Sequence, residues 1–279
     1  MIINRRQFIR GIAIAAGVGG TALAGLIAYP YVLARAQKEL MISGSVAVSR
    51  FVALLVAPFI EKHTHVKIAI EGGGSVAGLV ALDHGGIDLA MMSRDLNFEE
   101  FNLDLHSNLI GIEGVAIVVH PSMNIRSISL EQLDDIFEGA ITNWKQLGGP
   151  NAKINLYIRN DGSTTRAFVE DVVMKGAKFA RDAKVFESAV GLSDALGEDP
   201  HGIGYLTNKN LSKQVKAVAI DGVEISDKTL LLKLYPLYRD MFLVNKNSAS
   251  PAAKDFVRYS LSAIGQEVLV KHGLTQVSR

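Results

Sequence analysis

The 279-residue chain contains no cysteine and one tryptophan, and neither sign of charge dominates it. The absence of cysteine excludes disulfide bonds, thiolate zinc sites, cysteine nucleophiles and a lipidated N-terminal cysteine. The formal net charge is only +1, and residues 1–36 contain four arginines and no acidic residue, which leaves 25 basic against 28 acidic side chains in the remainder. A slightly acidic body lacks the basic field that gathers DNA or RNA, so we expect no nucleic-acid partner.

Apolar residues make up 48% of the chain, enough for a buried core in one large or two medium-sized domains. Short apolar runs predict buried strands at residues 66–70, 87–91, 115–120 and 154–158. Longer amphipathic stretches predict helices at 46–62, at 76–83 and, from the capping box that starts at Ser129, up to about 138. This alternation predicts an α/β fold. Because no linker rich in proline or serine divides the chain, any two lobes would be connected by strands.

The N-terminus has the residue order of an export signal. Arg5, Arg6 and Arg10 precede an uncharged stretch at residues 11–33, and basic residues followed by an apolar core direct a chain out of the cytoplasm. The segment around the paired arginines resembles a twin-arginine signal. We expect cleavage after Ala36; the alternative is an uncleaved anchor, since the 23 uncharged residues are long enough to span a bilayer. In either case the body would lie in the periplasm or at the outer face of the cytoplasmic membrane.

Three turns of small residues each precede a helix-like stretch. They are Ser43-Gly44-Ser45, Glu71-Gly72-Gly73-Gly74-Ser75 and Asp161-Gly162-Ser163-Thr164-Thr165. The first N–H groups of a helix are unpaired and carry partial positive charge, glycine lets the backbone approach a ligand, and hydroxyl side chains add donors. A single serine in this position is more often a helix cap than a ligand. Three such turns in one chain favour a site for a tetrahedral oxyanion.

Two arginines stand beside these turns. Arg159 precedes the third turn, where its guanidinium can fork two oxygens of an anion while Asp161 holds its plane. Arg94 follows Ser93 at the end of a buried run, and strand ends line ligand crevices in open α/β sheets. A ligand and a structural ion pair are equally compatible with the position of Arg94. Asp88, in the same run, is interpreted as a turn partner outside the site.

The three turns belong to a longer series of segments that resembles, in order, the motifs of the phosphate-binding proteins of the Pst transporter. The resemblance covers residues 40–279 and also includes Ser93-Arg94 and residues 136–144, 202–205 and 235–239. One glycine cluster would be weak evidence for a family. Many segments in the same order are strong evidence for the family.

The resemblance implies a type II periplasmic binding protein fold, in which crossing strands join two α/β lobes and the ligand lies in the cleft. The first lobe would comprise residues 40–118 and 234–279, and the second residues 119–233. Each lobe would contribute four side chains to the binding of inorganic phosphate: Ser45, Ser75, Ser93 and Arg94 from the first, and Arg159, Ser163, Thr164 and Thr165 from the second. The protein would be a monomer, without catalytic activity or cofactor, that delivers phosphate to the permease subunits of an ABC importer.

The sequence departs from the family pattern at Ala47, Val76 and Thr164. In addition, Arg94 occupies the position where some relatives have an acidic acceptor for the proton of hydrogen phosphate. Sulfate, arsenate and other oxyanions therefore remain alternative ligands.

Two other functions are compatible with a cleft that holds an oxyanion. An extracellular phosphate-ester hydrolase would need a nucleophile elbow, a Walker motif or a metal site. The sequence has neither motif, and the pair His63 and His65 is interpreted as a solvated turn. A membrane-anchored sensor would retain residues 11–33 and signal to another protein.

Overall fold

The computed structural model describes residues 38–277. The predicted export signal, its cleavage after Ala36 and the alternative anchor lie outside these residues. Within residues 38–277, no helix has the length and apolar character needed to cross a bilayer. All described helices and strands belong to one compact unit that begins at residue 37.

The first lobe is built on a mostly parallel sheet. β1 (Lys38–Gly44) pairs in parallel with β2 (Val66–Gly72) on one side and with β3 (Leu89–Met92) on the other. The antiparallel strand β10 (Tyr238–Lys246) extends the sheet beside β3. All four residues of β3 are buried, as expected for a strand that is covered on both faces.

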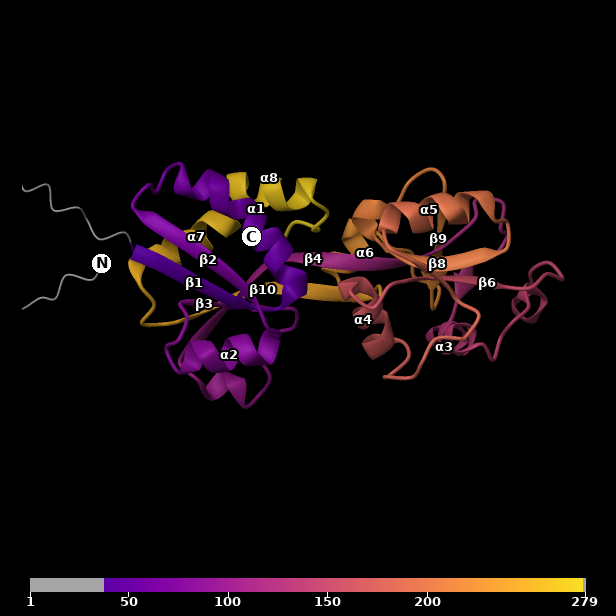
Figure 1. Cartoon of the computed structure of the whole chain (residues 1–279), viewed down its shortest axis with the longest axis horizontal. Helices are drawn as coiled ribbons and strands as arrows, with labels where there is room; N and C mark the ends of the chain where they lie inside the picture. The colour runs from indigo at the N-terminus through magenta and orange to yellow at the C-terminus, as the bar shows by residue number, and fades with distance from the viewer. Residues whose placement is uncertain (1–37, 278–279) are drawn as a thin grey trace, which may run out of the picture. The chain divides into compact units, whose positions relative to one another are not determined.

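Helices cover both faces of this sheet (Figure 1). One face carries α1 (Val46–Ile60), α7 (Pro251–Leu261) and α8 (Ala263–Lys271), and the other carries α2 (Ser75–Asp83). Phe59 of α1 is fully buried, and its ring packs edge-on against Phe256 of α7 with centroids 5.0 Å apart. The apolar stripe of α1 packs with α7, α8 and the strands in one buried core.

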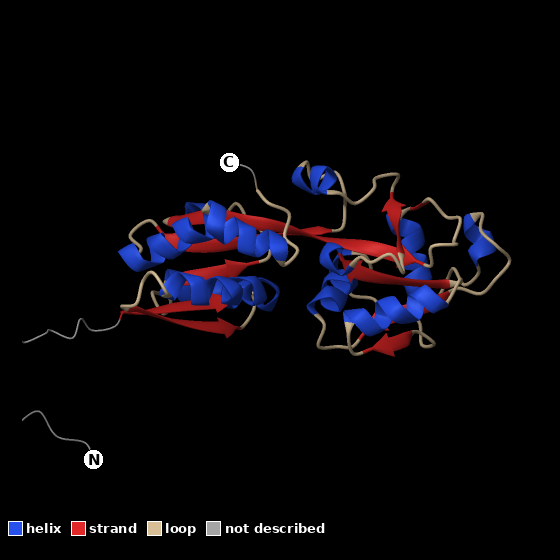
Figure 2. Cartoon of the chain, turned by 90° about the horizontal axis from the view of Figure 1, so that it is seen from above, coloured by secondary structure: helices blue, strands red, loops and turns tan. Residues whose placement is uncertain are grey.

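β4 (Leu105–Val119) connects the two lobes. Its residues up to Gly114 pair with β10, and its residues from Val115 pair with β8 (Gly202–Thr207) and β9 (Lys216–Ile220). Figure 2 shows long strands that pass from one group of helices and strands to the other. The strand order is β2-β1-β3-β10-β4-β8-β6-β7 within one sheet, so the lobes are joined by strands and not by a loop linker.

The second lobe adds β6 (Asn155–Arg159), which runs parallel to β8 and to β7 (Lys184–Phe186), and β5 (Ser127–Ile128), which pairs with β9. Its helices are α3 (Leu130–Glu138), α4 (Thr164–Val172), α5 (Ala189–Glu198) and α6 (Asp227–Leu231). Three short 3-10 helices complete the described elements: η1 (Glu100–Asn102) in the first lobe, and η2 (Trp144–Leu147) and η3 (Asn208–Asn210) in the second. The core is centred on the fully buried side chains of Phe137, Trp144, Tyr205 and Tyr235.

The predicted α/β alternation is confirmed. The capping box is present, because the Ser129 hydroxyl accepts from the Gln132 N–H at 3.0 Å and the Gln132 side chain accepts from the Ser129 N–H at 3.0 Å. The first helix ends at Ile60, two residues before the predicted end. The run predicted at 115–120 corresponds to the last five residues of the longer strand β4, which ends at Val119. The lobe boundaries near 118 and 234 stay a prediction.

Candidate functional site

The first two turns meet at the ends of three parallel strands. The N–H of Ser45 donates to the carbonyl of Met91 at 2.8 Å, and the N–H groups of Gly73 and Gly74 both donate to the carbonyl of Gly44 at 2.9 Å. Gly44 has φ +139°, and a Cβ on it would lie 2.2 Å from the Met91 oxygen. Only glycine fits this close approach, so the sequence fixes the turn between β1 and α1 against the end of β3.

Neither α1 nor α2 has a side-chain cap among the hydrogen bonds of the described residues. The Ser45 hydroxyl, at the N-cap position of α1, is therefore not occupied by its own helix. The first backbone N–H groups of both helices are left for solvent or a ligand. This differs from the ordinary capping role that a serine at this position would have.

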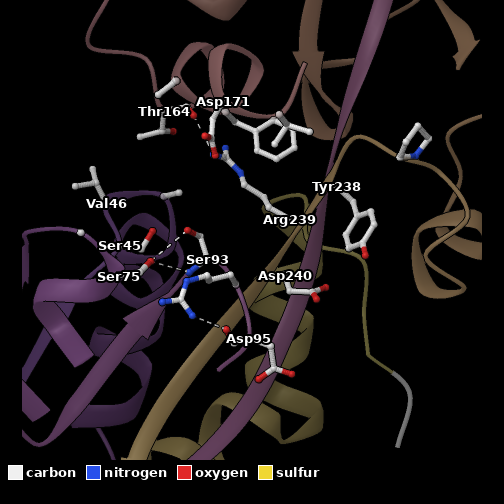
Figure 3. A pocket seen from close by; sticks show the side chains of 17 residues that line it. Ser45, Val46, Ser75, Ser93, Asp95, Thr164, Asp171, Tyr238, Arg239 and Asp240 are labelled. Atoms are coloured by element: carbon white, nitrogen blue, oxygen red, sulfur yellow. Dashed lines mark hydrogen bonds between the residues drawn. The ribbon is translucent and has the colours of Figure 1, made fainter. Parts of the chain in front are cut away.

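Ser75 and Ser93 form a small hydroxyl pair. The Ser75 hydroxyl accepts from the Ser93 N–H at 3.2 Å and lies 3.4 Å from the Ser93 hydroxyl. Figure 3 shows both side chains close to Ser45, on the wall of the cavity that the first lobe provides. The structure thus brings three of the predicted hydroxyl ligands together.

Arg94 is held by an ion pair. Its Nη1 and Nη2 donate to the two carboxylate oxygens of Glu100 at 2.7 and 2.8 Å, and Nη1 also donates to the Asp95 carbonyl at 2.8 Å. These hydrogen bonds raise the pKa of Arg94 and lower the pKa of Glu100. Of the two roles that the sequence left open for Arg94, the structure contains the structural ion pair.

The third turn begins α4 in the second lobe. The Ser163 hydroxyl accepts from the Arg166 N–H at 3.2 Å, so Ser163 is an ordinary N-cap. Arg166 forms ion pairs with Asp161 at 2.7 Å and with Glu170 at 2.8 Å. The prediction that Asp161 holds the plane of Arg159 is therefore wrong, because Asp161 pairs with the arginine on the first turn of α4.

Arg159, the last residue of β6, is held by main-chain carbonyls instead. Its Nε donates to the Phe186 carbonyl at 3.2 Å and its Nη2 donates to the Glu187 carbonyl at 2.9 Å. Within residues 38–277 it forms no ion pair with a carboxylate. Its positive charge is thus oriented but not neutralised.

The predicted residues line two cavities. The larger cavity, of about 760 Å³, is lined by Ser45, Ser75, Ser93, Arg94 and Thr164. The smaller cavity, of about 230 Å³, is lined by Arg159, Ser163, Thr164 and Thr165. Thr164 belongs to both, and it lies across the larger cavity from the three serines (Figure 3).

A charged cluster on the strands that join the lobes was not predicted from the sequence. Arg239 of β10 donates from Nε to Glu113 of β4 at 2.7 Å and from Nη1 to the Thr164 carbonyl at 2.9 Å. Glu113 also accepts from Arg50 of α1. Burial lowers the pKa of Arg239, and Glu113 opposes this effect. The only sequence signal was that Arg239 ends the family-like segment 235–239.

Tyr205 of β8 also lies at the smaller cavity. Its hydroxyl accepts from the Arg159 N–H at 3.1 Å. Burial raises the pKa of Tyr205 to about 12, so the side chain is a neutral phenol near neutral pH. It therefore fixes the backbone of Arg159 without adding negative charge to the cavity.

Over the part of the chain that the structure describes, no group of three or more histidine, aspartate or glutamate side chains could hold a metal ion. His63 stacks on Phe59 with ring centroids 4.0 Å apart, and its Nδ1 lies 3.0 Å from the Phe59 carbonyl. The predicted ligand side chains are hydroxyls and guanidinium groups, and the larger cavity is also lined by Asp95, Asp171 and Asp240.

Comparisons with known proteins identify the family of the chain. Residues 31–263 match the family model of the PBP superfamily domain. The phosphate-binding protein PstS of Bacillus subtilis is 32% identical over 241 residues, which cover 85% of this chain and 79% of that protein. An ABC-type phosphate transport receptor from Vibrio cholerae has a crystal structure with 28% identity and a TM-score of 0.80, covering 86% of this chain and all of that one.

A crystal structure from Clostridium perfringens, described as a putative phosphate ABC transporter substrate-binding protein with bound phosphate, is 31% identical. It has a TM-score of 0.63 and covers 86% of this chain and all of that one. The predicted periplasmic binding protein fold is confirmed by these structures. The chain therefore belongs to the PBP superfamily and, within it, to the family of the PstS phosphate-binding proteins.

Proposed function

We propose that this protein captures inorganic phosphate between its two lobes and delivers it to the permease subunits of an ABC importer. The observation that carries the proposal is Arg159, whose guanidinium lines the smaller cavity and has no carboxylate partner in the described structure. A guanidinium with free charge beside a helix N-terminus favours an anion. The phosphate-binding relatives support phosphate as that anion.

The proposed ligands come from both lobes. Ser45, Ser75, Ser93 and Arg94 face the larger cavity, while Arg159, Ser163, Thr164 and Thr165 line the smaller one. A phosphate that contacts the ligand side chains of both lobes stabilises the closed arrangement of the lobes. Only that arrangement forms all the hydrogen bonds to the anion. Arg94 would have to exchange Glu100 for phosphate in order to contribute.

The proposal includes export of the body as a monomer. Residues 1–36 would act as a cleaved twin-arginine-like signal or as an anchor at the outer face of the cytoplasmic membrane. Mass spectrometry of the protein isolated from its own membrane and soluble fractions would distinguish a chain that starts at residue 37 from one that keeps its first residues.

Isothermal titration of the full chain with phosphate, in a buffer free of phosphate and sulfate, tests the ligand. We expect stoichiometric binding with a micromolar or lower Kd, and weaker binding of sulfate. Tighter binding of sulfate or arsenate would keep the site and change its ligand. No binding of any of the three anions would contradict the proposed function.

Replacement of Ser75 by alanine tests the first-lobe wall of the site. We expect phosphate binding to weaken by about 0.5–1.5 kcal/mol, because the hydroxyl is a neutral hydrogen-bonding group. The control is Ser49→Ala in α1, whose hydroxyl donates to the Val46 carbonyl and lines neither cavity. Equal titration curves for the two variants would remove Ser75 from the site.

A further inference from the structure

The smaller cavity contains a second guanidinium that the sequence did not indicate. Arg50 comes from α1 in the first lobe, whereas Arg159, Ser163 and Thr165 come from the second. The Arg50 side chain is 44% exposed, and its Nε donates to the Ala47 carbonyl at 3.3 Å. One guanidinium from each lobe therefore lines the smaller cavity.

The carboxylate that pairs with Arg50 is shared. Glu113 binds Arg50 through Oε1 and Arg239 through Oε2. The Nη2 of Arg239 lies 2.6 Å from the same Oε2 as an additional ion-pair contact. Two guanidinium groups and one carboxylate leave this cluster with one unit of excess positive charge.

The excess charge lies at the cavity end of the cluster. The side chains of Glu113 and Arg239 are 2% and 6% exposed, so they form a buried neutral pair. Arg50 is the exposed member and lines the cavity. Because Arg50 shares its one carboxylate partner with a second guanidinium, it is only partly neutralised and retains positive charge for a ligand.

The charges around the two cavities differ. Asp95, Asp171 and Asp240 line the larger cavity, whereas none of the described carboxylates lines the smaller one. The polar lining of the smaller cavity consists of hydroxyls, the Asn210 amide and the two guanidinium groups. Arg159 and the Arg50 cluster together provide about two positive charges, which match a doubly charged oxyanion such as hydrogen phosphate.

We infer that Arg50 is the cation by which the first lobe binds the anion, and that it contacts the ligand opposite Arg159. This inference rests on the proposed function. It assigns to α1 the role that the sequence suggested for Arg94, whose two terminal nitrogens are both bound to Glu100. Glu113 then acts as a positioning residue, because its Oε1 accepts a hydrogen bond from Arg50 and holds this guanidinium at the smaller cavity.

Titration of full-length variants with inorganic phosphate tests the inference. We expect Arg50→Ala to raise the Kd about 10- to 100-fold, the effect of losing a charge-assisted hydrogen bond. Arg50→Lys retains the charge without the planar fork, so its Kd should lie between those of Arg50→Ala and the parent chain. Arg258→Ala is the control, because Arg258 pairs with Asp255 on α7 and lines neither cavity.

A change in folding is separated from a change in binding by two further measurements. Thermal unfolding without phosphate should be nearly the same for Arg50→Ala and the parent chain, since Glu113 and Arg239 still form a pair. The dependence of the Kd on salt should also become weaker in Arg50→Ala, because one charge is missing from the binding site. Loss of packing alone would not change the salt dependence.

The outcomes distinguish this inference from the proposed function. If the parent chain binds no phosphate, the proposed function fails and the inference fails with it. If the parent chain binds phosphate and the Kd of Arg50→Ala stays within about threefold of it, a factor too small for a charge-assisted contact, only the inference is overturned. A larger loss in Arg94→Ala than in Arg50→Ala would also overturn it and return the role to Arg94.

Discussion

Replacement of Arg159 by alanine is expected to weaken phosphate binding by about 1.5–3 kcal/mol, which is roughly 10- to 100-fold in Kd. The guanidinium is oriented by the carbonyls of Phe186 and Glu187 and lines the smaller cavity. An oriented guanidinium forms charge-assisted hydrogen bonds to an oxyanion without a further cost of ordering the side chain. Isothermal titration of the variant measures the loss directly.

The stability of Arg159→Ala should change little. No described carboxylate depends on Arg159 for its charge balance, so the truncation leaves no unpaired ion behind. Arg181→Ala is a matched control, because Arg181 is an exposed arginine of the same lobe and lines neither cavity. An Arg159→Ala variant that binds phosphate as tightly as Arg181→Ala would exclude Arg159 as a ligand.

The parts of the site that the sequence predicted are those that depend on local backbone structure. The glycines of the first two turns and the hydroxyls beside them are visible as short runs, because a close approach such as that of Gly44 to Met91 permits one residue type. The short buried strand β3 was predicted in the same way, from a local run of apolar residues. Such features need no knowledge of distant partners.

The charged partners could not be predicted in this way. Arg50 and Glu113 are 63 residues apart, and Glu113 and Arg239 are 126 residues apart. A single glutamate in an apolar strand and a single arginine in a helix have no local signature. Glu113 and Arg239 form a pair because the neighbouring strands β4 and β10 place them opposite each other.

The error at Asp161 has a related cause. The sequence places Asp161 two residues from Arg159, and proximity along the chain suggested an ion pair. In the structure Arg159 ends β6 and donates to the carbonyls of Phe186, the last residue of β7, and of Glu187, whereas Asp161 lies in the turn next to Arg166 of α4. The tertiary fold sets the direction of the Arg159 side chain, and this direction determines its hydrogen-bond partners.

Replacement of Glu113 by glutamine is expected to lower the free energy of unfolding by about 3–5 kcal/mol. Glu113 provides the negative charge between Arg239, which is 6% exposed, and Arg50. Glutamine has nearly the same shape but no charge, so the buried Arg239 would keep its positive charge without a counter-ion. Urea denaturation followed at equilibrium measures the change as a shift of the midpoint at constant slope.

Two control variants separate charge from packing in this prediction. Arg50→Ala keeps the buried pair of Glu113 and Arg239, and its stability should stay close to that of the parent chain. The double variant Glu113→Leu and Arg239→Met removes both buried charges, so it should recover most of the stability that Glu113→Gln loses, because apolar side chains of similar volume can replace a buried ion pair. If Glu113→Gln loses less than about 1 kcal/mol, the weight of an exposed ion pair, then Arg239 does not depend on Glu113 for its charge balance.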